Sequence, residues 1–325
     1  MLAFYCMGEF ELIDKYFKVP HARKDVVMGP GDDCALLTLP PDTQLAVSTD
    51  TLVSGVHFFP DMDPVDLGYK ALAVNLSDLA AMGAEPRWVS LALTLPAINE
   101  GWVAGFAEGF LELAEYYNVA LVGGDMTRGP LSITISVKGS VPAGRALMRS
   151  GAKAGDGIYV TGTLGDAALA LSHLLGKRTL NENQLAAVLP RLDHPHPRIL
   201  AGQALRGLAG SALDLSDGLA SDLGHILKAS GVRAQIDLDL LPLSPVLQDA
   251  VSEQEAWQLA LAGGDDYELC FTVPEEHRGA LDTALAHSGV KFSRIGRIVA
   301  GEPGIDYLRG DQAVELQLKG WDHFA

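Results

Sequence analysis

The feature that most constrains the fold is the segment from Pro64 to Met82, which reads as a helix with apolar residues on most sides. Asp63 and Pro64 supply an N-cap and a first helical residue, and Gly83 supplies a C-terminal stop. A helix that is apolar all round is usually buried. This one also carries Asp78, although an unpaired buried carboxylate is energetically costly. We therefore expect Asp78 to have a partner.

Strand and helix signals alternate along the rest of the chain. Helical signals cover Trp102–Tyr117, DAALALSHLL and Asp217–Ala229, while strand signals lie in CALLTL, QLAVST, VSLALTL, LSITISVKG, GIYVTG, SALDLS and YELCFTV. This order predicts an α/β protein of the α+β type, with mixed sheets. The loop PAGRALMRSGAKAGD marks a boundary near residue 150, so we expect two domains, residues 1–150 and 151–325.

Composition places the chain among soluble globular proteins, because 48% of its 325 residues are hydrophobic and 20% are charged. It shows no apolar run long enough to cross a bilayer and no signal peptide, so we expect a cytoplasmic protein. The net charge of −17 argues against nucleic acid as the main partner. The three cysteines are widely spaced, which favours buried thiols over a zinc site or disulfides.

Two short motifs recur in the same order. An LSD triplet ends at Asp78 and GGD follows at Asp125, 47 residues later; a second LSD ends at Asp217 and GGD follows at Asp265, 48 residues later. The repeat suggests two halves of related architecture.

Acidic residues gather beside glycines and apolar segments. The set comprises Asp32, Asp33, Asp50, Asp78, Asp125, Asp214, Asp217, Asp265 and Asp266. Any one of them reads as an ordinary turn or capping residue, whereas the set as a whole indicates a site at strand ends. Two unit charges about 4 Å apart repel by roughly 4 kcal/mol at an effective dielectric of about 20, so converging carboxylates need protons or cations. Oxygen ligands of this kind suit Mg²⁺.

The common phosphate-binding motifs are absent. No Lys is followed by Ser or Thr, which excludes a Walker A loop, and VTGTLGDAAL is only a weak phosphate-cradle signal. His57 is open to two interpretations, a satisfied polar residue or a substrate contact. Four basic residues near the domain boundary are candidates either for holding phosphate or for an ordinary solvated loop: Arg128, Arg145, Arg149 and Lys153.

Nine motifs in order resemble those of the thiamine-monophosphate kinases over nearly the whole chain. They are GEF, GPGDDCA, STDTLVSGVHF, KALAVNLSDLAAMGA, LVGGDMTRG, RSGAKAGD, DLSDGL, GGDDYEL and GWDHF. That family belongs to the superfamily of aminoimidazole ribonucleotide synthetase and selenophosphate synthetase. The resemblance implies a two-domain PurM-like architecture and a homodimer whose N-terminal sheets pair into a barrel. It assigns metal binding, ATP binding and dimerisation to residues 1–150, and completion of the active site to residues 151–325.

The resemblance also implies site residues. Metal ligands would be Asp33, Thr49, Asp50, Asp78, Asp125, Asp214 and Asp217, with Asp50, Asp78 and Asp125 most critical. ATP contacts would be Gly124, Asp125, Arg149 and Ser216, and thiamine phosphate contacts would be His57, Asp265 and Trp321. Position 265 departs from the family, which often has the longer Glu there, so the reach of that contact differs.

The implied reaction transfers the γ-phosphoryl group of ATP to the phosphate of thiamine monophosphate, giving thiamine diphosphate and ADP. The attacking phosphate oxygen is already ionised at neutral pH, so direct in-line attack needs no general base. Several Mg²⁺ ions would mediate between an acidic protein and its two phosphate ligands, with no nucleic-acid or membrane partner. Selenophosphate synthesis is disfavoured, because no cysteine stands beside a lysine in a Gly-rich N-terminal loop. A non-catalytic acidic metal-binding module is the reading from another class.

Overall fold

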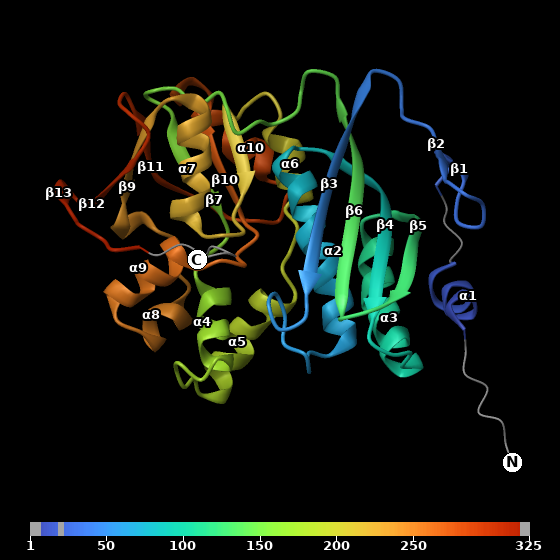
Figure 1. The fold of residues 1–325 in the computed structure, drawn as a ribbon. Coiled ribbons are helices and arrows are strands. Elements are labelled where there is room, and N and C mark those ends of the chain that lie inside the picture. Colours follow the sequence, from blue (N-terminus) through green and yellow to red (C-terminus); the bar gives the residue numbers. More distant parts are fainter. Residues whose placement is uncertain (1–7, 19–22, 319–325) are drawn as a thin grey trace, which may run out of the picture. The chain divides into compact units, whose positions relative to one another are not determined.

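The computed structural model describes residues 8–18 and 23–318. The chain divides into two compact units. The first runs up to Leu79 and includes Glu85–Ala143; the second comprises Ala80–Ala84 and the chain from Gly144 onward. Figure 1 shows that each unit combines a sheet with helices, so the expected α/β class with mixed sheets is confirmed.

The first unit is built on a four-stranded sheet of order β3-β6-β4-β5. Its strands are β3 (Thr43–Val53), β4 (Glu85–Leu95), β5 (Ala120–Arg128) and β6 (Ser132–Pro142). β4 and β5 are parallel, and β6 is antiparallel to both β3 and β4. Within the described residues this sheet is open, so the barrel implied by the resemblance is not formed by one chain.

Two helices, α2 (Pro64–Ala81) and α3 (Glu100–Tyr116), belong to this unit. The Asp63 carboxylate caps α2 by accepting a hydrogen bond from the Val65 amide at 2.8 Å. Leu72, Leu76 and Leu79 of α2 are fully buried. The sequence therefore predicted this buried helix correctly, to within one residue at its C-terminal end.

The two helices approach each other closely through glycines. A Cβ on Gly68 of α2 would lie 2.1 Å from the Phe106 carbonyl oxygen, and one on Gly109 of α3 would lie 1.9 Å from the Val65 oxygen. Because only glycine fits at such distances, these two residues fix how α3 crosses α2. The placement of α2 matters because it carries Asp78.

A short hairpin, β1 (Val26–Met28) with β2 (Leu36–Leu37), lies on the β5 side of the sheet (Figure 1). It packs on the buried Trp88 through its apolar side chains. Asp25 precedes the hairpin and accepts hydrogen bonds from Arg23 at 2.6 Å and from Arg87 at 2.7 Å. This ion cluster ties the hairpin to strand β4. The unit also holds α1 (Glu9–Leu12) and the π-helix η1 (Ile13–Phe17).

The second unit is built on a seven-stranded sheet of order β13-β12-β9-β11-β7-β10-β8. β12 runs parallel to β9, and the other pairs are antiparallel. The strands are β7 (Gly157–Thr161), β8 (Ser211–Asp214), β9 (Arg233–Asp237), β10 (Leu269–Val273), β11 (Phe292–Val299), β12 (Ile305–Arg309) and β13 (Gln312–Ala313). β10 lies between β7 and β8, and so brings distant segments of the chain together.

The helices of this unit surround two apolar cores. One core lies between the sheet and α7, and the other lies among α4, α5, α8 and α9. The elements are α4 (Asp166–Leu174), α5 (Glu182–Asp193), α6 (Ile199–Leu205), α7 (Leu219–Ser230), η2 (Leu238–Leu240), α8 (Pro245–Ala250), α9 (Glu253–Ala262), η3 (Glu275–Ala280) and α10 (Leu281–Leu285).

The repeated LSD and GGD motifs occupy different local structures. Asp78 lies inside α2, whereas Asp217 lies in the loop between β8 and α7. Asp125 lies inside β5, whereas Asp265 follows α9 in a loop. The suggestion of two related halves therefore gains no support from these motifs.

Candidate active site

Asp78 has a protein partner. Ser48 of β3 donates its hydroxyl to the Asp78 carboxylate, which is only partly buried. The α2 helix therefore presents this acid at the edge of its buried surface, toward the neighbouring strand. This arrangement explains how an otherwise apolar helix accommodates a carboxylate.

Asp50 lies two residues along β3 from Ser48 and points toward the same helix. Its backbone amide donates to Asn75 of α2 at 3.2 Å, and the Asn75 side chain is held by the Ala71 carbonyl at 2.9 Å. Burial and, to a smaller extent, the charge of Asp78 together raise the pKa of Asp50 to about 6. Asp50 and Asp78 therefore form a pair of interacting carboxylates.

Asp50 does not end its strand, as the sequence had suggested. The chain continues in β3 through Leu52, because the residues after Asp50 are β-branched or apolar and pair in register with β6. The same correction applies to Asp125, which lies within β5. Both acids are therefore held on rigid strands.

Asp125 lies on the other face of the sheet. Paired residues share a face, and a continuous row of pairs links Thr51 through Ala92 to Asp125. Thr49 alternates with Asp50 and shares the face of Asp125. The four candidate ligands on this unit's helix and strands thus divide into Asp50 with Asp78 and Thr49 with Asp125.

Gly124 is needed for close strand packing. A Cβ at this position would lie 1.8 Å from the Leu91 carbonyl oxygen on β4. Asp33 is exposed in the turn between β1 and β2, where its amide donates to Asp32 at 2.9 Å. That turn lies on the β5 side of the sheet, away from the Asp50 and Asp78 pair (Figure 1).

His57 has a structural partner. Its Nδ1 atom accepts a hydrogen bond from the Val53 amide at 3.0 Å, and its own amide donates to the Val53 carbonyl at 2.9 Å. The ring thus closes the turn that follows β3, with Nδ1 unprotonated. This observation agrees with the reading of His57 as a satisfied polar residue.

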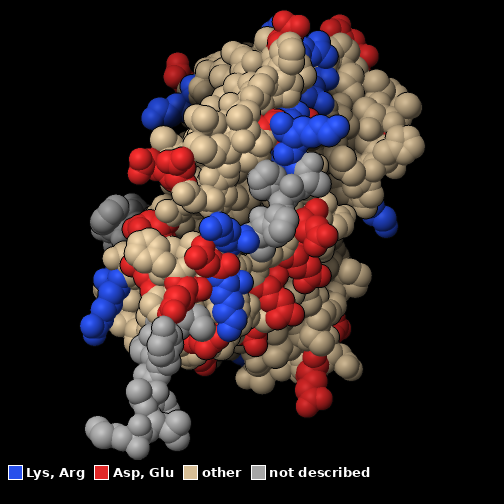
Figure 2. All heavy atoms as spheres, turned by 90° about the vertical axis from the view of Figure 1, so that its right-hand side faces the viewer, with Lys and Arg blue, Asp and Glu red and all other residues tan. Residues whose placement is uncertain are grey.

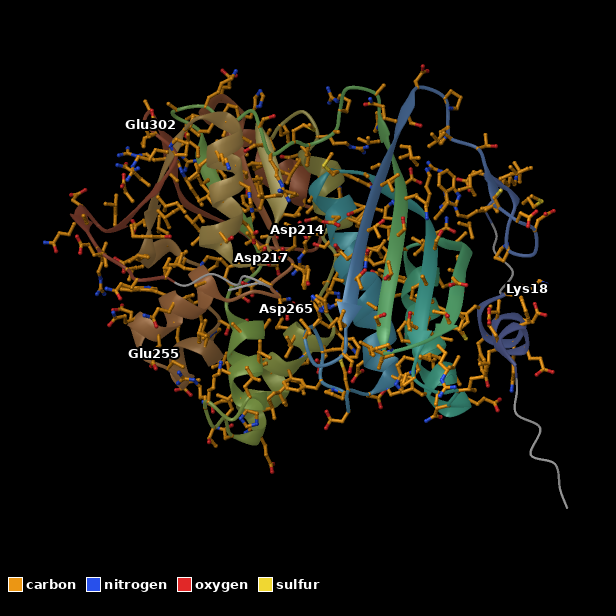
Figure 3. All side chains as sticks on the ribbon, in the orientation of Figure 1. Lys18, Asp214, Asp217, Glu255, Asp265 and Glu302 are labelled. Atoms are coloured by element: carbon orange, nitrogen blue, oxygen red, sulfur yellow. The ribbon has the colours of Figure 1, made fainter. Side chains whose placement is uncertain are left out.

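In the second unit, three labelled aspartates lie close together in Figure 3, namely Asp214, Asp217 and Asp265. Asp214 ends β8 and is buried, and Asp217 follows in the loop before α7. The Asp265 amide donates to the Ser216 carbonyl at 2.9 Å. The structure therefore brings together four candidate site residues of this unit, namely Asp214, Ser216, Asp217 and Asp265.

Asp222, in the first turn of α7, fixes the backbone of this loop through its side chain. Its buried carboxyl accepts the Asp217 amide at 3.0 Å and also the Ser216 amide. Burial raises the pKa of Asp222 to about 7, although these amides and the charge of Arg149 oppose the rise. Arg149 thus lies within electrostatic reach of the loop. The only local sequence signal for Asp222 is an acid near the start of an apolar helix, a position that many capping residues share.

The three acids of the segment Gly263–Glu268 differ in burial and in their hydrogen-bond partners. Asp265 is partly exposed, whereas Asp266 and Glu268 are buried. The Asp266 carboxyl accepts the Gly165 amide at 3.0 and 3.1 Å, at the start of α4. Burial raises the pKa of Asp266 well above its ordinary value. The glycine turn of VTGTLGDAAL, a weak phosphate-cradle signal, is thus filled by the chain's own side chain.

Glu268 is fully buried and bound by two arginines. Arg191 donates to it at 2.5 Å, Arg198 donates at 2.6 Å from Nε, and the Thr161 hydroxyl donates at 2.6 Å. Burial alone would raise the pKa of Glu268, but Arg198 and Arg191 lower it, so the group is ionised. No local sequence signal revealed this cluster, because its members are 70 and 77 residues apart.

The remaining basic candidates are spread apart. Arg128 is exposed at the end of β5, and Lys153 is exposed with its amide bonded to Asp156 at 2.9 Å. Arg145 lies against Gly207, whose Cβ would be 2.4 Å from its guanidinium. Trp321 lies outside the described residues. Across the part of the chain that the structure describes, no three His, Cys, Asp or Glu side chains converge as a ready-made metal site.

Comparison with known proteins identifies the family. The chain matches "AIR synthase related protein, N-terminal domain" over residues 31–141 and "AIR synthase related protein, C-terminal domain" over residues 153–307. It is 58% identical over 320 residues to the thiamine-monophosphate kinase of Escherichia coli K12, covering 98% of each chain. The chain belongs to the thiamine-monophosphate kinase family. The expectation of a phosphotransferase of this family is thereby confirmed.

Solved structures of thiamine-monophosphate kinases share the fold. The crystal structure from Stenotrophomonas maltophilia K279a is 46% identical with a TM-score of 0.83, covering 88% of this chain and 92% of that one. A second structure, "AaThiL complexed with AMPPCP and TMP", is 33% identical with a TM-score of 0.77, covering 98% and 97%. The two-domain PurM-like architecture is confirmed. No helix in the described residues is both long and apolar enough to span a bilayer.

Proposed function

We propose that this chain transfers the γ-phosphoryl group of ATP to thiamine monophosphate, giving thiamine diphosphate and ADP. The observation that carries the proposal is 58% identity, over nearly the whole chain, to a thiamine-monophosphate kinase. A relative that is 33% identical was solved with AMPPCP and TMP, an ATP analogue and the substrate. The proposed reaction is therefore that of the family.

The two expected domains, residues 1–150 and 151–325, each contribute a defined set of residues to the proposal. Residues 1–150 supply the metal ligands Asp33, Thr49, Asp50, Asp78 and Asp125, the ATP contacts Gly124, Asp125 and Arg149, and the substrate contact His57. Residues 151–325 supply the metal ligands Asp214 and Asp217, the ATP contact Ser216 and the substrate contacts Asp265 and Trp321. The hydrogen bond between the Asp265 amide and the Ser216 carbonyl supports placing substrate and nucleotide contacts near one another in the second unit.

The donor set fits magnesium. Asp50 and Asp78 interact strongly enough to raise the pKa of Asp50, and a divalent cation would relieve that repulsion. All the proposed ligands offer oxygen atoms, which hard cations prefer. When bound, magnesium would neutralise charge on the transferred phosphoryl group.

The chain's own residues orient the reactants. Arg149 and the Ser216 loop bind the nucleotide, and Asp265 binds the thiamine phosphate. An oxygen of the acceptor phosphate attacks the γ-phosphorus in line, a new P–O bond forms, and the bond to ADP breaks. The acceptor oxygen is already ionised, so no side chain removes a proton, and alignment supplies most of the acceleration.

The open face of the first sheet supports a homodimer. Leu45 and Val47 of β3 are 48% and 57% exposed on that face. Pairing with a second copy would cover them and close the two sheets into a barrel. A chain with Val47→Asp should then run as a monomer in light scattering, and an unchanged mass would contradict this interface.

The reaction is tested directly by phosphorus NMR. Purified protein with ATP, thiamine monophosphate and Mg²⁺ should yield thiamine diphosphate and ADP, and chelation with EDTA should stop it. ADP formed with inorganic phosphate but no diphosphate would indicate another ATP-using enzyme of the superfamily. Metal binding without any nucleotide turnover would indicate a non-catalytic module. Either result would overturn the proposal.

A further inference from the structure

The Gly263–Glu268 segment holds two residues in an uncommon backbone conformation. Asp265 has a φ of 65° and Tyr267 a φ of 47°, both in the left-handed region. A short polar residue such as Asp tolerates this region, but an aromatic residue such as Tyr267 seldom adopts it. Such a conformation persists only when surrounding contacts impose it. The contacts that impose it here can be traced.

Backbone hydrogen bonds join this segment to the loop that follows β8. The Asp265 amide donates to the Ser216 carbonyl at 2.9 Å, and the Tyr267 amide donates to the Leu215 carbonyl at 2.8 Å. The Leu215 amide in turn donates to the Glu268 carbonyl at 2.9 Å. Three backbone hydrogen bonds therefore join the segment to the loop, and Glu268 is the residue directly before β10.

The Glu268 side chain anchors that point to three other elements. It binds Thr161 of β7, Arg191 of α5 and Arg198 at the start of α6. Glu268 is fully buried, while the side chains of Arg191 and Arg198 are 22% and 18% exposed. Arg191 also interacts electrostatically with Asp266 and Asp166, so the cluster joins several charged side chains. A buried ion cluster is weak evidence for stability, and its best-supported use is to select one arrangement of the chain.

We propose that Glu268, held by Arg191 and Arg198, is a positioning residue that fixes the strained Asp265–Tyr267 backbone and so aims Asp265 at the substrate. This inference rests on the proposed function, because it takes Asp265 as a thiamine monophosphate contact. Glu268 acts through Asp265 and touches no substrate itself. The cluster should therefore affect substrate binding more than nucleotide binding.

The test uses Arg191→Gln, because Arg198 still holds Glu268 in this variant and folding should survive. Misplacing a binding group that acts on substrate and transition state alike raises KM, so we expect about a tenfold rise in KM for thiamine monophosphate. KM for ATP should change by less than about twofold. Arg191→Lys, which keeps the charge, should recover part of the loss.

A double-variant cycle separates positioning from a general structural effect. In an Asp265→Asn background, Arg191→Gln should change KM for thiamine monophosphate by less than about twofold, because the group it positions is already lost. Fully multiplicative effects would overturn the inference. So would an Arg191→Gln variant with a lowered melting temperature but unchanged KM. Arg178→Gln is the matched control, since Arg178 pairs with Glu255 at 3.1 Å elsewhere in the same unit.

Hydrogen exchange tests the positioning role of Glu268, Arg191 and Arg198, which we call the brace, without an activity measurement. Exchange of the Asp265 and Tyr267 amides should speed up in Glu268→Gln and Arg191→Gln but not in Arg178→Gln. If the wild-type chain made no thiamine diphosphate while these amides responded as expected, the proposed function would fail and the brace would stand. If the chain made the product but these amides were unaffected, the brace would fail and the function would stand.

Discussion

The carboxyl of Asp222 on α7 accepts a hydrogen bond from the backbone amide of Asp217 at 3.0 Å. A buried side chain thus holds the shape of the partly buried loop that carries a proposed metal ligand. Asp222 and Asp217 are five residues apart, and only Asp217 is a proposed metal ligand. Figure 3 labels Asp217 beside Asp214 and Asp265.

Replacing Asp222 should loosen this loop. Asp222→Ala leaves the amides of Asp217 and Ser216 without their acceptor, at a cost of about 1–3 kcal/mol in the free energy of unfolding. We expect kcat/KM to fall at least about tenfold, because the loop no longer aligns the nucleotide. Asp222→Asn keeps an acceptor oxygen and should lie much nearer the wild type in steady-state kinetics. Equal kcat/KM for the Ala variant and the wild type would refute the role.

Asp78 should be needed for turnover and not for folding. In Asp78→Asn an oxygen still accepts the Ser48 hydroxyl, so thermal unfolding should change little. Turnover should drop by about 100-fold or more, as when one strong electrostatic contact is removed from a reacting centre. The rate should also lose its dependence on magnesium concentration. Ser48→Ala is the control that removes the hydrogen bond and keeps the charge; a wild-type rate in Asp78→Asn would show that the metal assignment is wrong.

Alanine should lower the stability of the fold at Gly124 but not at the adjacent Gly123. Gly124→Ala places a Cβ 1.8 Å from the Leu91 carbonyl oxygen, whereas Gly123→Ala meets no atom within 4 Å. Gly124→Ala should therefore lower the free energy of unfolding by about 1–3 kcal/mol, the usual cost of overpacking. Gly123→Ala should leave the denaturation midpoint nearly unchanged. Equal midpoints for the two variants would contradict the described strand packing.

The ion cluster at Asp25 should be a source of acid sensitivity. Burial would raise the pKa of Asp25, but hydrogen bonds from Arg23 and Arg87 lower it from 3.8 to about 2. The unfolded chain therefore takes up this proton first as the pH falls. The cluster's contribution, about 1–2 kcal/mol, is present above about pH 4 and lost as the pH falls toward about 2.

Acid unfolding of Asp25→Asn checks this window. The variant should be less stable than wild type at neutral pH, and the difference should shrink between about pH 4 and pH 2. Glu108→Gln on α3, which also removes one acid but from an exposed position, is the matched control for the change in net charge. A constant difference between Asp25→Asn and wild type across this range would contradict the linkage.

Surface charge limits what the chain attracts without a mediating cation. The net charge is −17, and Asp and Glu gather in a stripe on the face shown in Figure 2. Four exposed glutamates lie on α3, namely Glu100, Glu108, Glu112 and Glu115. Raising the ionic strength should therefore weaken the repulsion between this acidic surface and ATP. We expect free magnesium to change the KM for ATP more than salt does.

Local signals predicted much of the fold. The helix carrying Asp78 was predictable because its cap, its apolar residues and its terminating Gly83 are neighbours in sequence. The sequence marks Asp50 as a candidate ligand but does not show that it lies inside a strand, because the length of that strand depends on pairing with β6. The strands β1, β5, β9, β11, β12 and β13 were not predicted, since short strands and strands paired with distant segments leave a weak local pattern.

The candidate site was predictable to the extent that its residues lie in motifs. Asp217 and Asp265 stood out because they adjoin glycines, and the fold then brought their loops together. Glu268 is an acidic residue that is fully buried. Nothing in the neighbouring sequence distinguishes it from an ordinary exposed acid. Its partners Arg191 and Arg198 became visible only in three dimensions, because contacts spanning 77 and 70 residues have no periodic signature.

The Asp266 carboxyl at the start of α4 has a consequence for how such chains are recognised. It acts as an internal mimic of a ligand, seated where a glycine-rich turn would otherwise receive one from solution. A search for nucleotide sites based on strand, glycine turn and helix would select residues 158–175 and would point to a position that the protein fills itself. In this chain the Asp266 carboxyl accepts the Gly165 amide, and the proposed ligand residues Ser216, Asp217 and Asp265 lie on other loops.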